Sequence, residues 1–285
     1  MNAFKVILSD DCLIEILMQS GRGGLSSMDL QSTVQRLDFL EKNGFIFKAG
    51  GTFRLTVRGR DAVYNLKEWD LQVRRGEVLP YIEQMEISPG SVVADIGCGG
   101  GQTLMACLRY MPSVIYGFDR NSGALEMAEA FLESAPGETE CRLIAADALN
   151  LPIGDRTCTH VISRVVIQKL DQEKSIIEMG RITRVGGFCF IHTTCAGYYI
   201  KRILTGLRSP LDMCISIFAL LNGSFLLLTG RQYCIRLGSR RICEAYVSPY
   251  GLKRRLRDRG WNIISTEVSR FLLLPASVKI IAQKR

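Results

Sequence analysis

Histidine is almost absent from this chain. Its 285 residues include only two, His160 and His192, and the ten cysteines contain no Cys-x-x-Cys pair. The common zinc sites need clustered histidine and cysteine ligands, so we expect no metal site, and Cys195 is expected to be neither a metal ligand nor a nucleophile. Residues 1–8 hold only a brief apolar run, too short for a signal peptide. We therefore expect reduced cysteines, mostly core thiols, in a cytoplasmic protein.

Acidic residues are scarce in the last third of the chain. From Lys201 to the end there are 16 basic and 4 acidic residues, a balance of +12 that leaves −4 for residues 1–200. A basic region of this kind can face an anionic substrate, a membrane surface or a nucleic acid. An ordinary solvated surface would have the same composition, and the sequence leaves these readings open.

Charge of either sign is missing from residues 213–230, and arginines flank this run at positions 202, 208, 231 and 236. Its length approaches the roughly 20 residues that span a bilayer. Polar residues near its centre, Ser216, Asn222-Gly223 and Ser224, instead predict two short helices joined by a turn. We expect the section to form a lid over an apolar pocket. Monotopic contact with a membrane is the second hypothesis, and a transmembrane helix is the least favoured.

The most informative stretch is Val92–Gly101, which reads V-V-A-D-I-G-C-G-G-G. An apolar run typical of a buried parallel strand leads to Asp95, and a glycine-rich turn then opens into the helical pattern of residues 103–108. Glycines at such a junction let the backbone bend sharply and let a ligand approach where a Cβ would collide. The stretch predicts a ligand site, although dinucleotide enzymes and some purely structural turns are equally rich in glycine.

Two further predicted strands also end in an acid. Residues 113–119 end at Asp119, about twenty residues after the turn, where a carboxylate can meet a ribose diol. Residues 141–147 end at Asp147. Because ligands in open α/β sheets bind beyond the carboxyl ends of the strands, the three acids are expected at one edge of a sheet.

This succession resembles the class I S-adenosylmethionine-dependent methyltransferases, whose first motif reads much like D-I-G-C-G-G-G at residues 95–101. The resemblance covers roughly residues 78–187 and the last strand. A dinucleotide turn has the form G-x-G-x-x-G, whereas residues 97–102 read G-C-G-G-G-Q. The resemblance implies an α/β fold with a Rossmann-like, seven-stranded methyltransferase sheet, and S-adenosylmethionine as the cofactor.

The same resemblance implies which residues would hold the cofactor. The turn would lie against its methionine part, Asp119 would hold the ribose hydroxyls, and Asp147 with its two successors would border the adenine. The end of the fourth strand, predicted at residues 159–162, would form the bottom of the site. The cofactor-binding residues predicted in this way are Asp95, Gly97, Cys98, Gly99, Gly101, Asp119, Arg120, Asp147, Ala148, Leu149, Ser163 and Arg164.

Residues on the substrate side are less clearly marked. His192 follows the predicted fifth strand, residues 188–191, and its neutral imidazole could accept a proton; a hydrogen-bonded structural role is the alternative. Many relatives carry a histidine near Gln168, which this chain lacks. Gln168, Tyr198 and Tyr199 are the remaining substrate candidates. A general base is dispensable, because methyl transfer from a sulfonium depends mainly on in-line positioning.

The amino-terminal part predicts a winged helix. Helices are expected over residues 10–19, from Ser26 or Ser27, and over about 34–43, followed by a hairpin at residues 45–56. Such modules often bind DNA through the third helix, but here that helix has mixed charge without the basic excess that phosphate contacts need. We therefore favour dimer contact or substrate cover as the role of this module.

These observations combine into one reading. We predict an α+β winged-helix domain at residues 1–66 and a methyltransferase domain at residues 67–285, with an insertion at about 196–246. The predicted reaction is methyl transfer to a small, partly apolar molecule. The alternatives are an RNA or peptide methyltransferase and a DNA-binding regulator that retains the fold. Nucleic acid is disfavoured because Ser163-Arg164-Val165-Val166 stands where base-modifying enzymes carry N-P-P-Y. A second copy of the chain and a membrane surface are the other expected partners.

Overall fold

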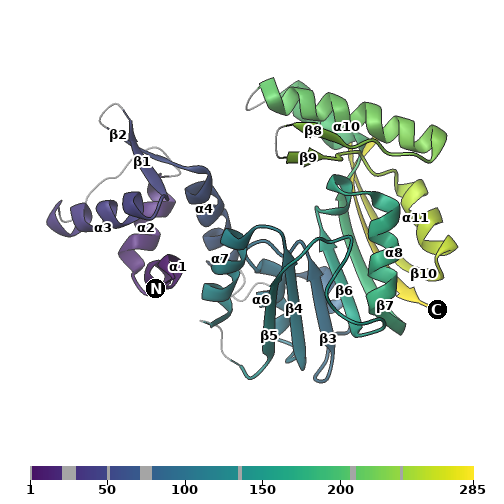
Figure 1. The fold of residues 1–285 in the computed structure, drawn as a ribbon, viewed down its shortest axis with the longest axis horizontal. Coiled ribbons are helices and arrows are strands. Elements are labelled where there is room, and N and C mark those ends of the chain that lie inside the picture. The colour runs from purple at the N-terminus through teal and green to yellow at the C-terminus, as the bar shows by residue number, and fades with distance from the viewer. Residues whose placement is uncertain are drawn as a thin grey trace.

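The computed structural model describes residues 2–20, 30–49, 52–70, 79–133, 137–205, 210–237 and 240–285. A sheet forms its centre, the amino-terminal elements lie to one side, and helix α10 (Pro210–Thr229) lies across the top (Figure 1). The predicted helix from Ser26 or Ser27 falls outside the described residues.

The central sheet has seven strands in the order β10-β11-β7-β6-β3-β4-β5. Strands β3 to β7 pair in parallel, whereas β11 runs antiparallel to both of its neighbours. The apolar run before the glycines forms β3, whose last four residues are buried, as expected for a strand covered on both faces. The strands are β3 (Val92–Ile96), β4 (Val114–Asp119), β5 (Glu140–Ala145), β6 (Cys158–Arg164), β7 (Thr183–Thr194), β10 (Trp261–Phe271) and β11 (Leu274–Lys284).

Strand β7 begins earlier than predicted. We predicted this strand over residues 188–191, but Thr183 already pairs with Cys158, and the register shifts before His160 pairs with Phe188. Gly186, with φ of 78°, lies inside this irregularity. The glycine pair therefore marks a bulge within the strand instead of a turn before it.

Helices cover both faces of the sheet. One hydrophobic cluster joins α6 (Gln102–Leu108) and α7 (Ser122–Glu133) to the amino-terminal elements, and a second joins α8 (Gln172–Ile182) and α11 (Pro249–Asp258) to the opposite face. Ser248 caps α11 and Pro249 occupies its first turn, which is a favoured start for a helix. Two short segments, α5 (Pro80–Glu83) and the 3-10 helix η2 (Ile167–Lys169), complete this part.

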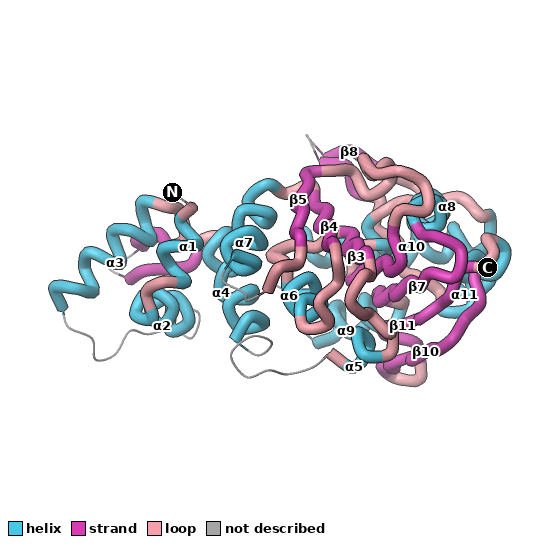
Figure 2. The backbone as a smooth tube through the Cα atoms, turned by 90° about the horizontal axis from the view of Figure 1, so that it is seen from below, coloured by secondary structure: helices cyan, strands magenta, loops and turns pink. Residues whose placement is uncertain are grey.

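The amino-terminal elements project from the side of the sheet that carries α7 (Figure 2). Helix α1, which we did not predict, packs against α7, and Asn2 Nδ2 donates to the Glu126 carbonyl at 2.7 Å. Helices α2 and α3 and the hairpin fall close to their predicted positions, while the assignment as a winged helix stays a prediction. The elements are α1 (Ala3–Leu8), α2 (Asp11–Ser20), α3 (Leu30–Lys42), β1 (Ile46–Ala49), β2 (Thr52–Leu55) and α4 (Val57–Trp69).

The predicted insertion contains α9 (Ala196–Thr205), α10 and the hairpin of β8 (Ile235–Leu237) and β9 (Arg240–Ile242). The prediction of two short helices was wrong, because α10 is one helix of 20 residues. Asn222, which we read as a turn signal, instead bonds to the chain beneath the helix: its Nδ2 donates to the Tyr233 carbonyl at 2.9 Å. By length and composition Leu211–Thr229 could cross a membrane, with mean hydropathy 1.9 and 28% of that stretch buried.

The cysteines also differ from expectation. Cys234 and Cys243 form a disulfide, so these two are not reduced thiols. They flank β8 and β9, whose antiparallel register pairs Ile235 with Ile242 and so brings the two sulfur atoms together. Of the free cysteines in the described residues, most are buried as predicted, namely Cys98, Cys107, Cys158, Cys189 and Cys195.

Candidate functional site

The glycine turn begins where β3 ends. Its first two backbone N–H groups, of Gly97 and Cys98, donate to the Phe118 carbonyl of β4 at 2.7 and 3.0 Å. Gly97 has φ of 73°, and a Cβ there would lie 2.3 Å from Val166. A Cβ on Gly100 would lie 2.4 Å from Asn65 Oδ1 of α4. These two glycines are needed because neighbouring side chains approach the turn closely.

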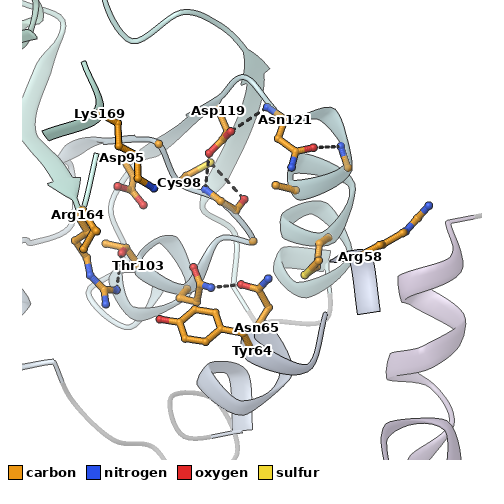
Figure 3. Close-up of a pocket in the computed structure, with 18 residues that line it drawn as sticks. Arg58, Tyr64, Asn65, Asp95, Cys98, Thr103, Asp119, Asn121, Arg164 and Lys169 are labelled. Atoms are coloured by element: carbon orange, nitrogen blue, oxygen red, sulfur yellow. Dashed lines mark hydrogen bonds between the residues drawn. The ribbon is translucent and has the colours of Figure 1, made fainter. Parts of the chain in front are cut away.

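Asp119 joins the turn to the end of β4. Its Oδ2 accepts the Gly99 N–H at 3.0 Å, and its Oδ1 accepts the Asn121 N–H at 2.9 Å. Two backbone donors therefore fix the carboxylate, which retains free lone pairs for a ligand. Figure 3 shows Asp119 and Asn121 beside the turn, with Tyr64 and Asn65 across from them.

Asp95 is the most perturbed acid of the site. Its side chain is buried, and Oδ1 has no hydrogen-bond partner among the described residues. Burial raises the pKa of this carboxyl to about 7; the charge of Arg164 opposes the shift and that of Asp119 adds to it. Arg164 in turn donates from Nη1 to Thr103 Oγ1 at 3.1 Å. A buried carboxylate left partly unsatisfied favours a cationic or donor ligand.

A cavity of about 700 Å³ opens at this edge of the sheet. A neighbouring cavity of about 350 Å³ shares several of its lining residues. Most of the predicted cofactor residues line one or both, namely Asp95, Gly97, Cys98, Gly99, Asp119, Arg120, Ala148 and Arg164. The structure thus brings the ends of β3, β4 and β6 together around one space.

Four predicted cofactor residues lie outside both linings. Gly101 packs against α7, where a Cβ would lie 3.0 Å from Ala128. Ser163 is buried in β6, paired with Ile96. Asp147 Oδ1 accepts the N–H of Leu149 at 3.0 Å, so these two residues shape the loop after β5.

The predicted substrate residues are also not gathered at the cavities. Gln168 is buried and accepts a hydrogen bond from Thr193 Oγ1 at 2.8 Å, and buried Tyr199 donates to Glu244 at 2.9 Å. Tyr198 is exposed on α9. Burial lowers the pKa of His192, and the charges of Arg164 and Lys279 lower it further. His192 is therefore neutral near pH 7, but it does not line either cavity.

Several lining residues were not predicted. Tyr64 and Asn65 reach the cavity from α4, and Asn65 Oδ1 accepts a hydrogen bond from Gln102 Nε2. No local pattern in the sequence marks these two residues. Asn121 and Lys169 also line the cavity, and their positions just after the ends of β4 and β6 were the available signal.

Comparisons with known proteins agree with this geometry. Residues 94–191 match the model of a methyltransferase domain family. The chain is 28% identical over 106 residues to the methyltransferase GfsG of Streptomyces halstedii, covering 37% of this chain and 38% of that protein. It is 27% identical over 139 residues to a demethylmenaquinone methyltransferase of Desulfitobacterium hafniense, covering 48% and 54%. The chain thus matches about half, or less, of the length of these relatives.

Solved structures share the fold. One of them is an S-adenosylmethionine-dependent methyltransferase from Methanosarcina mazei. The two structures superpose with a TM-score of 0.51 at 18% sequence identity, and the match covers 73% of this chain and 98% of that protein. At this identity the likeness shows the arrangement of the sheet and helices, which is a Rossmann-like methyltransferase fold.

The residues fit S-adenosylmethionine, the cofactor that this fold and family imply. The unsatisfied oxygen of buried Asp95 suits a ligand that carries positive charge. The Asp119 carboxylate is held in place by a backbone N–H and can still accept hydrogen bonds from the two hydroxyls of a diol. A Cβ built on Gly99 would reach only Gln102 Oε1, at 4.0 Å, so the turn leaves room for a ligand. Residues 94–191 therefore form a methyltransferase domain on a Rossmann-like methyltransferase fold, and S-adenosylmethionine is the cofactor that this domain and fold imply.

Proposed function

We propose that this chain transfers a methyl group from S-adenosylmethionine to a small, partly apolar acceptor. The observation that carries the proposal is the cavity of about 700 Å³. This volume lies in the range of small-molecule sites. Its lining combines the two acids with apolar side chains, including Met127 and Val165. A cofactor and a small acceptor can share such a space.

The residues of the chain would bind the cofactor and the acceptor and orient them toward each other. When bound, S-adenosylmethionine supplies an electrophilic methyl group on a sulfonium. Asp119 would accept hydrogen bonds from the ribose hydroxyls, and the buried carboxylate of Asp95 would balance positive charge. Correct alignment of the acceptor then supplies most of the rate enhancement. His192, which is outside the cavity lining, is not required as a base.

Two observations favour a small acceptor over nucleic acid. Arg36, on the helix that would enter a DNA groove, forms an ion pair with Asp10 at 2.9 Å, which reduces its availability for phosphate. The name of one relative, a demethylmenaquinone methyltransferase, describes a small-molecule acceptor.

The amino-terminal elements support the same proposal. We infer that residues 1–66 act as a winged-helix module that covers the substrate or contacts a second copy of the chain. Asn65 and Tyr64 of α4 line the cavity, which favours the covering role.

Label transfer tests the proposal. Incubation of the chain with methyl-tritiated S-adenosylmethionine and a cell extract should label the organic-soluble small molecules. Label confined to the RNA or protein fraction would contradict the acceptor class. Calorimetry with duplex DNA at two salt concentrations tests the regulator alternative, which predicts tight DNA binding without cofactor heat.

Asp119→Ala provides the matched test of the site. Loss of its charge-assisted hydrogen bonds should weaken cofactor affinity by about 1–3 kcal/mol in calorimetry. Asp258→Ala is the control, because Asp258 is an exposed acid on the remote helix α11. Equal affinity in the two variants would remove Asp119 from the site.

A further inference from the structure

Helix α10 exposes several large apolar side chains although it packs on the domain and buries two polar residues. Its polar residues Ser216 and Asn222 are buried, with 0% and 3% exposure. Its outward side is mostly apolar apart from Ser224 and Thr229, and Leu221 and Leu228 are 67% and 86% exposed. Surface helices of soluble proteins normally turn their apolar stripe inward. The exposed apolar residues of α10 are Leu211, Met213, Ile217, Leu221, Leu227 and Leu228.

Specific contacts fix this orientation. Asn222 Oδ1 accepts the Tyr233 N–H at 2.8 Å, and its Nδ2 donates to the carbonyls of Tyr233 and Glu244. A Cβ on Gly223 would lie 2.3 Å from the ring of Tyr246. One side of α10 is thus bound to the chain that carries β8 and β9, and the helix lies along the domain (Figure 1). Its exposed apolar side chains are on the remaining side.

A second apolar group is exposed at the tip of the β10–β11 hairpin. Leu272 and Leu273 are 66% and 89% exposed and have φ of 49° and 64°. Hairpin turns that need positive φ normally use glycine, asparagine or aspartate. Leucine here adds backbone strain to the cost of exposing apolar surface in water. Two unfavourable features at one tip point to a function of the exposed side chains.

The two groups are joined through α9. Gly197 of α9 lies against the Leu274 carbonyl, and Lys201 Nζ lies 5.8 Å from the centre of the Phe271 ring. Arg202 of α9 forms an ion pair with Asp212 of α10. We call the outward side of α10, the exposed Leu204 of α9 and the Leu272–Leu274 tip the apolar face.

The charges around the apolar face are basic. Lys201, Arg231 and Arg236 are exposed, and residues 201–285 carry a balance of +12. Asp212, the one acid of α10, is paired with Arg202. Exposed leucines bordered by lysine and arginine match the headgroup and acyl boundary of an anionic bilayer.

We propose that the apolar face docks onto an anionic lipid bilayer, with α10 lying in the plane of the membrane. The chain beneath α10 is hydrogen-bonded to segments that lie next to the cavity lining. The Val247 N–H donates to the carbonyl of Thr194, the last residue of β7, at 3.0 Å, and the Ala245 N–H donates to the Gln168 carbonyl at 2.9 Å. The next residue, Lys169, lines both cavities. The segment beneath the apolar face is thus connected by backbone hydrogen bonds to the part of the chain that lines the cavities.

Vesicle sedimentation tests the proposal on the full chain. Vesicles of phosphatidylcholine with phosphatidylglycerol should bind the chain at least tenfold more tightly than phosphatidylcholine alone, and added salt should weaken the binding. The double substitution Leu221→Glu with Leu228→Glu should lower the affinity at least tenfold. The control is Met111→Glu with Val185→Glu, because these residues are 65% and 58% exposed near the amino ends of β4 and β7. Equal vesicle binding by the two double variants would overturn the proposal.

A glycine variant separates docking from folding. Leu272→Gly with Leu273→Gly relieves the positive-φ strain, so the melting temperature should stay equal or rise while vesicle binding falls. Unchanged vesicle binding in this variant would also overturn the proposal. A dimer in sedimentation equilibrium that the α10 variant dissociates, without binding of wild type to vesicles, would assign the apolar face to a second copy instead.

Discussion

Helices α7 and α10 lie on the same domain and use their apolar residues in opposite ways. α7 buries Leu125, Met127 and Phe131 against the sheet. α10 buries Ser216 and Asn222 together with Leu226, and it leaves most of its large apolar side chains exposed. The first pattern follows from burial of apolar area in water, and the second does not. The contrast indicates that the core of the domain is specified by burial, whereas α10 is specified by polar contacts on its inner side.

The glycine turn gives a second view of the same contrast. Gly97 is required by the approach of Val166, and Gly223 is required by the ring of Tyr246. In the turn, the side chain that approaches the glycine helps to shape a ligand cavity. In α10, the ring that approaches the glycine packs the helix against the rest of the domain. A glycine alone therefore does not tell which purpose it serves.

The largest expected effect comes from Gly97→Ala. The new Cβ meets Val166 and the residue keeps a positive φ, so left-handed strain and overpacking together should cost about 2–5 kcal/mol of unfolding free energy. Gly90→Ala is the control, because it shares the positive φ but has open space around the added Cβ, with an expected cost of about 1–2 kcal/mol. Denaturant melts of both variants measure the difference. Equal losses would show that the close packing of the turn is unimportant.

The next largest effect is expected from the hydrogen bonds that hold α10 to the domain. Asn222→Ala removes three hydrogen bonds to backbone groups and should cost about 1–3 kcal/mol. Leu228→Ala should change the unfolding free energy by less than about 0.5 kcal/mol, because this leucine is exposed. If Leu228→Ala lost more unfolding free energy than Asn222→Ala, the apolar side of α10 would matter more for stability than its polar contacts, which contradicts the contrast with α7.

The smallest effect is a pH dependence of cofactor binding. In the free protein Asp95 has a pKa raised to about 7, chiefly by burial, so its carboxyl is increasingly protonated below pH 7. A cationic ligand binds the ionised form, so affinity should rise with pH, by at most about 1.4 kcal/mol per unit, and level off above pH 7. The Asp95→Asn variant should lose this slope. Comparing the calorimetric cofactor affinities of the two proteins at each pH removes the contribution of the cofactor's own titration. If affinity changed with pH in the same way in both proteins, Asp95 would be excluded as the titrating group.

The sequence predicted the parts of the site that depend on strand order. Buried strands that end in acids, with glycines after the first, were enough to place Asp95 and Asp119 at one edge. Local patterns carry this information, because parallel strands align their carboxyl ends. The seven-stranded sheet was implied by the resemblance to a family, whereas the helix after the glycine turn and the helices α2 and α3 followed from hydrophobic periodicity.

The remaining features depend on contacts between distant segments. Asn65 reaches the turn from α4, and neither residue type nor spacing indicates this approach. Asn222 resembles a turn residue until Tyr233 and Glu244 are placed beneath it. The pair Cys234 and Cys243 required knowledge of the β8–β9 register. Each of these depends on packing that sequence windows do not contain.

The contact between Asn65 and the glycine turn has a consequence for exchange of small molecules. Because α4 forms one wall of the cavity, any shift of the amino-terminal elements changes the width of the opening. Uptake of fresh cofactor and release of the spent form are therefore tied to how firmly those elements hold to α7, through contacts such as that of Asn2 with the Glu126 carbonyl.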